Sequence, residues 1–246
     1  MKPLILSALI AVSLSPISVL AQEVLPYQLR SILGQYTEVY GGVRDGNSLS
    51  SLRVEGSIAQ DGRSMRFTML RKRPNLFRYR LFLNPNGGSV TSGYDGRIGW
   101  IRKETDQVVE TERLSGAALE ALKAQGRFES PLFRYEQKDD HQFKLLSQHK
   151  WQGQSVRVVE VIDPRGAVSH YFLDTRTAHV LRIDRYDNSG EIASQTLYRD
   201  YREVKGFPFA HEVEQRAAGE TVSIAKVESI SVNPGVLSFY FEEPSR

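Results

Sequence analysis

Hydrophobic and polar side chains alternate along two stretches in the first third of the chain. In Met65–Met69 large apolar residues occupy every second position, and after Arg73-Pro74-Asn75 the alternation resumes at Phe77–Leu81. Period-two alternation places one set of side chains on each face of a strand. The pattern therefore predicts two strands that share an apolar face of Met, Phe, Tyr and Leu, with an opposite face rich in Arg.

Further strands are expected along most of the chain, because short apolar runs recur between turn sequences. Asp95-Gly96 reads as a hairpin turn before a strand at 98–103. Later strands are expected at 168–174, 180–186, 191–198 and 210–216, with an interruption at Gly206-Phe207-Pro208, and at 238–241. The spacing indicates roughly eleven or twelve strands joined by short connections.

Two helices are expected among these strands. Residues 23–40 form an amphipathic helix that Gly41-Gly42 ends, and residues 115–124 are rich in helix formers, with Ser115 as the N-cap. A short helical turn is expected at 130–135. One face of the first helix carries Leu25, Leu29, Ile32 and Tyr36. We therefore predict a mainly β fold, an incomplete and strongly curved antiparallel β-barrel of about eleven strands covered by short α-helices.

The N-terminus has the pattern of a secretory signal peptide. Lys2 precedes an apolar run at Leu4–Leu20, and Ala21 stands before the polar Gln22. A membrane anchor is the alternative, but the run is short for a span and contains Pro16. We expect cleavage after Ala21, export to the periplasm, and a single domain formed by residues 22–246.

The amino-acid composition excludes several kinds of site and partner. The chain has no cysteine, which excludes disulfides, thiolate metal sites, a cysteine nucleophile and a lipid-modified N-terminal cysteine. Lys and Arg number 32 against 29 Asp and Glu, and they are scattered, so no nucleic-acid partner is expected.

The five histidines are the first candidates for a catalytic or metal-binding site. His170 and Asp174 share a strand face, but further ligands for a metal are missing. Ser169 next to His170 points to the opposite strand face, and no serine lies in a nucleophile elbow. No glycine-rich loop opens a helix in the phosphate-binding pattern. We therefore expect no enzymatic activity, no metal and no cofactor.

Four segments, in this order, resemble the family of outer-membrane lipoprotein-sorting proteins (LolA/LolB-like). They are the RKRPNLFR of Arg71–Arg78, the YDGRIGW of Tyr94–Trp100, the YFLD of Tyr171–Asp174 and the FYFEEP of Phe239–Pro244. The resemblance covers most of residues 22–246. It implies an incomplete barrel closed by helices, with an apolar cavity for acyl chains.

The apolar face of the alternating strands is the candidate for the acyl-chain cavity that the resemblance implies. A plain hydrophobic core is the alternative for such a face. The predicted cavity residues are Met65, Phe67, Met69, Phe77, Tyr79, Leu81, Ile98, Trp100, Leu181 and Ile183, and the predicted lid residues are Leu25, Leu29, Ile32 and Tyr36.

Two functions remain open at this point. One is a monomeric periplasmic carrier or chaperone that binds a lipid or acylated lipoprotein, receives it from an inner-membrane transporter or exporter, and passes it towards the outer membrane. The other is a sensor or interaction module that binds a membrane protein without lipid transfer. A hydrolase ranks third, since no residue pattern supports it.

Overall fold

The computed structural model describes residues 26–41, 49–83, 87–127, 129–135 and 140–244. The predicted signal peptide with its cleavage position, and Leu25 of the predicted lid, lie outside these residues. Within these described residues, thirteen strands form one antiparallel sheet. They are β1 (Ser51–Gln60), β2 (Arg63–Lys72), β3 (Leu76–Phe82), β4 (Ser89–Tyr94), β5 (Gly99–Glu104), β6 (Val109–Arg113), β7 (Gln142–Trp151), β8 (Gln154–Ile162), β9 (Val168–Asp174), β10 (Val180–Tyr186), β11 (Ile192–Val204), β12 (Phe207–Ala217) and β13 (Glu220–Val232).

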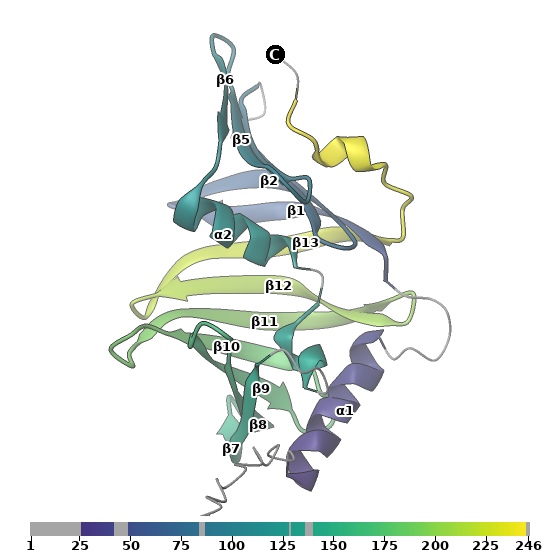
Figure 1. Cartoon of the computed structure of the whole chain (residues 1–246), viewed down its shortest axis with the longest axis vertical. Coiled ribbons are helices and arrows are strands. Elements are labelled where there is room, and N and C mark those ends of the chain that lie inside the picture. Colours follow the sequence, from purple (N-terminus) through teal and green to yellow (C-terminus); the bar gives the residue numbers. More distant parts are fainter. Residues whose placement is uncertain (1–25, 42–48, 84–86, 128, 136–139, 245–246) are drawn as a thin grey trace, which may run out of the picture.

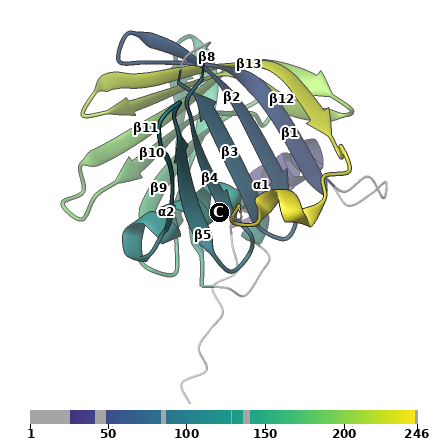
Figure 2. The ribbon, with the colours of Figure 1, turned by 90° about the horizontal axis from the view of Figure 1, so that it is seen from above.

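The sheet is a meander with one long-range join. Sequential strands pair from β1 to β6 and from β7 to β13, and β1 pairs with β13 in the middle of the sheet. The edge strands β6 and β7 do not pair with each other, so the sheet curls without closing (Figure 2). This arrangement confirms the predicted incomplete, curved barrel, although with thirteen strands in place of about eleven.

Two helices lie on the concave side of this sheet (Figure 1). The α-helices are α1 (Tyr27–Gly41) and α2 (Gly116–Gly126), and 3-10 turns form η2 (Pro131–Arg134) and η3 (Ser238–Phe241). Ser115 occupies the N-cap of α2 with extended backbone but makes no side-chain cap bond, whereas the Ser130 hydroxyl accepts a hydrogen bond from the Leu132 amide of η2 at 3.3 Å. The predicted helical segments are therefore present, with α1 beginning at Tyr27.

Two predicted elements near the C-terminal end are wrong. Residues 238–241 form the 3-10 turn η3, not a strand. The interruption expected at 206–208 is instead a two-residue hairpin turn of Lys205 and Gly206, both with positive φ, and Phe207 and Pro208 belong to β12. Pro208 is tolerated in β12 because the pairing of β12 with β13 begins only at Glu212, which leaves the Pro208 backbone at an open edge.

Strand register assigns each side chain to a face, because opposed residues of an antiparallel pair lie on the same side of the sheet. A continuous series of opposed residues links the face of β2 that carries Met65 to the face of β9 that carries Tyr171. The series is Met65, Ile58, Ala225, Val213 and Tyr198, then Thr196, Ile183 and Tyr171. The alternating face predicted from the sequence and the face under α1 are therefore one concave surface.

Each helix completes a core on that surface. Leu29, Ile32, Leu33 and Tyr36 of α1 are buried against the apolar side chains of β8, β9 and β10. Leu122 of α2 is buried with Phe77 of β3 and Tyr94 of β4. Gly99 allows α2 to approach closely, because a Cβ at this position would lie 2.5 Å from the Leu119 side chain.

The convex face carries ion pairs, and one of the buried acids among them is Glu214 of β12. Its carboxylate accepts hydrogen bonds from Arg216 at 2.5 Å, Thr221 at 2.7 Å and Arg199 at 2.8 Å. Burial acts to raise the pKa of Glu214, but these hydrogen bonds outweigh it and lower the pKa from 4.5 to about 2.

This depressed pKa predicts an acid-sensitive contribution to stability. The contribution is complete above pH 4.5 and is lost as the pH falls towards 2, because the unfolded chain takes up the proton first. Glu214→Gln should lower the free energy of unfolding at neutral pH by on the order of 2–3 kcal/mol and flatten its pH dependence in that window. Urea denaturation from pH 2 to 7 measures the free energy of unfolding and its pH dependence. Glu212→Gln is the matched control, and an equally flat profile for both variants would contradict the assignment.

Candidate functional site

Six of the predicted cavity residues lie on the concave face of β2 and β3. Met65, Phe67 and Met69 of β2 oppose or flank Tyr79 and Leu81 of β3 on this side of the sheet. Phe67 is 6% exposed and stacks on Tyr79 with ring centroids 5.5 Å apart, while the Met65, Met69 and Leu81 side chains are half-buried. Phe77, the sixth, lies beneath α2. This face is an apolar floor with open positions on β2 and β3.

The predicted position of Trp100 is wrong, and Ile98 lies in a turn. Trp100 opposes Gly93, which precedes Tyr94 of the concave face by one position, so the Trp100 ring lies on the convex side. There it is fully buried and its Nε1 donates a hydrogen bond to the Phe241 carbonyl of η3 at 3.0 Å. Ile98 precedes β5, and its amide donates to the Asp95 carboxylate at 2.7 Å. A one-residue difference in register exchanges the two faces, and the sequence alone does not fix it.

Leu181 and Ile183 lie on opposite faces, which corrects the prediction that they share one. The pairing of β9 with β10 shifts between Val180 and Arg182, which indicates a β-bulge. A bulge inserts one unpaired residue and reverses the alternation that follows. Ile183 packs in the core under α1, whereas Leu181 packs with Phe172 on the convex side.

The expected lid residues Leu29, Ile32 and Tyr36 face the concave surface and are buried there. Around them the interior is rich in tyrosine hydroxyl groups. Burial raises the pKa of both Tyr36 and Tyr171, and the side chain of Ser130, the N-cap of η2, opposes this rise. Burial raises the pKa of Tyr171 to about 12, so its hydroxyl keeps its proton and can donate at neutral pH.

Arg71 was not predicted as a site residue, although its position in the sequence contains the signal. It stands two residues after Met69, so strand alternation places it on the concave face, where it opposes Leu52 and Phe77. Its guanidinium carbon lies 5.8 Å from the centroid of the Phe77 ring. Burial lowers the pKa of Arg71. The concave surface therefore combines an apolar floor with one interior cation on β2.

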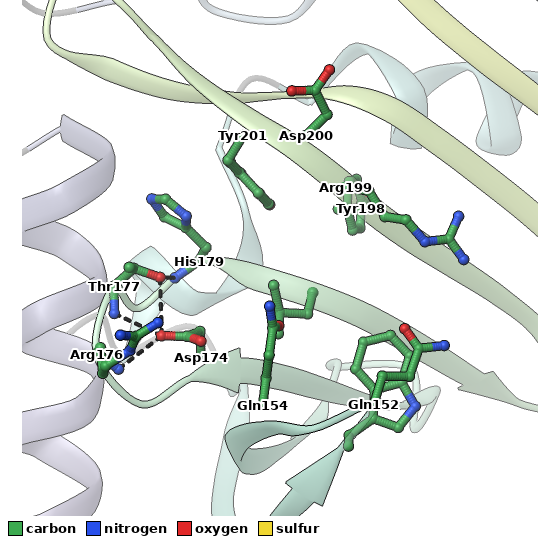
Figure 3. A pocket seen from close by; sticks show the side chains of 12 residues that line it. Gln152, Gln154, Asp174, Arg176, Thr177, His179, Tyr198, Arg199, Asp200 and Tyr201 are labelled. Atoms are coloured by element: carbon green, nitrogen blue, oxygen red, sulfur yellow. Dashed lines mark hydrogen bonds between the residues drawn. The ribbon is translucent and has the colours of Figure 1, made fainter.

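A second hollow, of about 360 Å³, lies near the turns that join β7 to β8 and β9 to β10 (Figure 3). Trp151 and Leu181 of the convex core line it, together with Asp174. The Asp174 carboxylate accepts hydrogen bonds from the Arg176 and Thr177 amides at 2.8 and 2.9 Å, which fixes the β9–β10 turn. The polar groups of Asp174 and its neighbours stabilise this turn, and Tyr198 of the core under α1 also lines the hollow.

The histidine singled out in the sequence has structural partners. His170 Nε2 lies 3.0 Å from the Glu160 carboxylate and its Nδ1 lies 2.8 Å from the Tyr186 hydroxyl. The Asp174 carboxylate is already hydrogen-bonded to backbone amides of the β9–β10 turn. Within the described residues no group of three or more His, Asp or Glu side chains is arranged to hold a metal ion. In the same part of the chain, no helix has the length and apolar character needed to cross a membrane.

Comparison with known proteins adds information on the fold. No family model and no curated protein matches the sequence. Among solved structures, a putative outer membrane lipoprotein-sorting protein domain from Vibrio parahaemolyticus is 16% identical, with a TM-score of 0.57 over 87% of this chain and 94% of that one. A LolA superfamily protein from Nitrosomonas europaea is 14% identical, with a TM-score of 0.56 over 87% and 97%. A DUF1329 family protein from Desulfovibrio piger is 12% identical, with a TM-score of 0.55 over 87% and 97%. The LolA-like fold suggested by the sequence resemblance is thus confirmed.

Proposed function

We propose that this protein is a periplasmic carrier or chaperone that binds the acyl chains of a lipid or lipoprotein on its concave face and passes them towards the outer membrane. The observation that carries the proposal is the apolar floor between two covering helices, formed by the buried Phe67 and the half-buried Met65, Met69 and Leu81. Methionine suits such a surface, because its flexible and polarizable side chain adapts to varied acyl shapes. Binding requires no covalent step, since each buried methylene contributes about 0.8 kcal/mol.

The descriptions of two proteins with similar structures support the proposed carrier function. Two of the similar structures are described as a LolA superfamily protein and a putative outer membrane lipoprotein-sorting protein domain. An exported carrier of this kind would receive its cargo from an inner-membrane transporter or exporter and would act as a monomer after cleavage behind Ala21. The cargo would be a lipid or an acylated lipoprotein, and no cofactor is needed.

Phe67→Asp tests the proposal at the centre of the floor. A carboxylate buried among Tyr79 and the methionines removes acyl contact and is costly to desolvate, so affinity for a fluorescent fatty-acid analogue should fall at least about tenfold. The measurement is a fluorescence titration of folded protein. Thr68→Asp is the matched control, because the neighbouring residue lies on the convex face and should leave binding nearly unchanged. An equal loss of affinity in both variants would contradict the assignment of ligand binding to the concave face.

A sensor or interaction module is the second candidate, and an exposed apolar surface at the C-terminal end favours it. Leu237 and Phe239 are 59% and 56% exposed, and Tyr240 beside them is also exposed. Such a patch suits contact with the periplasmic part of a membrane protein. Native mass spectrometry of protein purified from its own periplasm separates the two candidates. Copurified lipid supports the carrier, whereas a stoichiometric protein partner without lipid supports the module.

A further inference from the structure

Arg71 lies on the concave face with its Nε buried, and among the described residues it has no anionic partner. Arg80, Arg182 and Arg199, on the convex face, each form an ion pair with a carboxylate of the same face. In the part of the chain that the structure describes, Arg71 forms no ion pair, and its buried Nε has no hydrogen-bond partner. An arginine stays charged at any physiological pH, and a buried charge without a partner is costly. The chain therefore maintains an unsatisfied cation inside its concave surface.

Tyr198 of β11 lies on the same concave surface as Arg71, because the series of opposed strand residues that begins on β2 reaches it. Burial raises the pKa of Tyr198, and the positive charges of Arg185 and Arg71 oppose that rise. A guanidinium and a protonated phenol together offer several hydrogen-bond donors. Carboxylate and phosphate groups are the partners that such a donor set binds best.

The apolar floor begins at the same point. From Arg71, the concave face of β2 continues through Met69 and Phe67 to Met65. The six residue-to-residue steps of extended strand from Arg71 to Met65 span about 20 Å. A ligand with an oxyanion at Arg71 would therefore have an apolar path of that length for its hydrocarbon chain. A free inorganic anion would leave the path unused.

We propose that Arg71 is the headgroup subsite of the concave face and that the ligand is an amphiphile with a carboxylate or phosphate attached to its acyl chain. This inference rests on the proposed function and adds the charge class of the ligand to it. The Arg71 guanidinium binds the oxyanion, the Tyr198 hydroxyl donates a further hydrogen bond, and the hydrocarbon chain lies along Met69, Phe67 and Met65.

The test compares two ligands that share a chain and differ in the head. Dodecanoate and dodecanol are titrated into the wild-type protein and into Arg71→Met, with inorganic phosphate as a separate competitor. Wild type should bind dodecanoate about tenfold to one-hundredfold more tightly than dodecanol, because charge-assisted hydrogen bonds form only with the former. Arg71→Met should remove this preference while keeping the affinity for dodecanol. Arg71→Lys should keep part of it, and Tyr198→Phe should reduce it less than Arg71→Met does.

Arg66→Met is the matched control, because Arg66 lies on the same strand with its side chain on the convex face. It should retain the wild-type preference. Equal wild-type affinity for the two ligands, or an unchanged preference in folded Arg71→Met, would overturn the headgroup subsite and leave the acyl carrier standing. Displacement of dodecanoate by millimolar inorganic phosphate would overturn it in favour of a free-anion site. Failure of the wild type to bind either ligand would overturn the proposed function and this inference together.

Discussion

Trp100→Ala should lower the free energy of unfolding by about 3–5 kcal/mol, because it empties a fully enclosed site on the convex face. The indole lies directly on Gly93, where a Cβ would come within 2.3 Å of the ring. The Arg78 guanidinium carbon lies 5.9 Å from the ring centroid, and its Nη1 donates a hydrogen bond to the Tyr240 carbonyl at 2.9 Å. The substitution therefore removes the anchor of η3 together with the packing. Chemical denaturation measures the loss, and faster proteolysis at residues 237–244 reports release of η3.

Trp100→Phe separates packing from hydrogen bonding, since phenylalanine keeps an aromatic ring but has no donor for the Phe241 carbonyl. It should cost less than alanine, by about 1–3 kcal/mol. Trp151→Ala is the matched control, because Trp151 is the other tryptophan and is only partly buried. A loss at Trp151 as large as that at Trp100, with η3 equally resistant to protease, would show that the C-terminal contact contributes little.

Leu29→Ala should lower the free energy of unfolding by about 2–5 kcal/mol, because its side chain is fully buried between α1 and the sheet. If α1 also acts as a lid, the closed state loses more than the open state, and ligand exchange should become faster. Transfer of a bound fluorescent lipid to acceptor vesicles measures exchange, and thermal unfolding measures stability on the same samples.

Gln28→Ala, one position earlier on the exposed side of α1, is the control and should change neither measurement. A large loss of stability in Leu29→Ala with unchanged transfer would identify α1 as a fixed part of the core. That result would favour the interaction module over the carrier, because a carrier must open its apolar floor to release cargo.

Local sequence pattern predicted the elements well where local physics decides them. The strands at 168–174 and 180–186 agree with β9 and β10 at both ends, since alternation and the flanking turn residues act over a few positions. The amphipathic face of α1 is confirmed for Leu29, Ile32 and Tyr36. The 3-10 turn at 238–241 was missed, because its aromatic residues have high strand propensity and only docking on Trp100 and Arg78 holds them in a turn.

The sequence by itself determined the curved antiparallel meander, its two covering helices and the apolar face of β2 and β3. Only the tertiary structure decided which other side chains share that face. The register of β5 against β4 sent Trp100 to the convex side, the bulge in β10 separated Leu181 from Ile183, and the pairing of β1 with β13 brought Arg71 towards Tyr198. Alternation along a strand is a local property, whereas register, bulges and the meeting of distant strands depend on pairings across the whole chain.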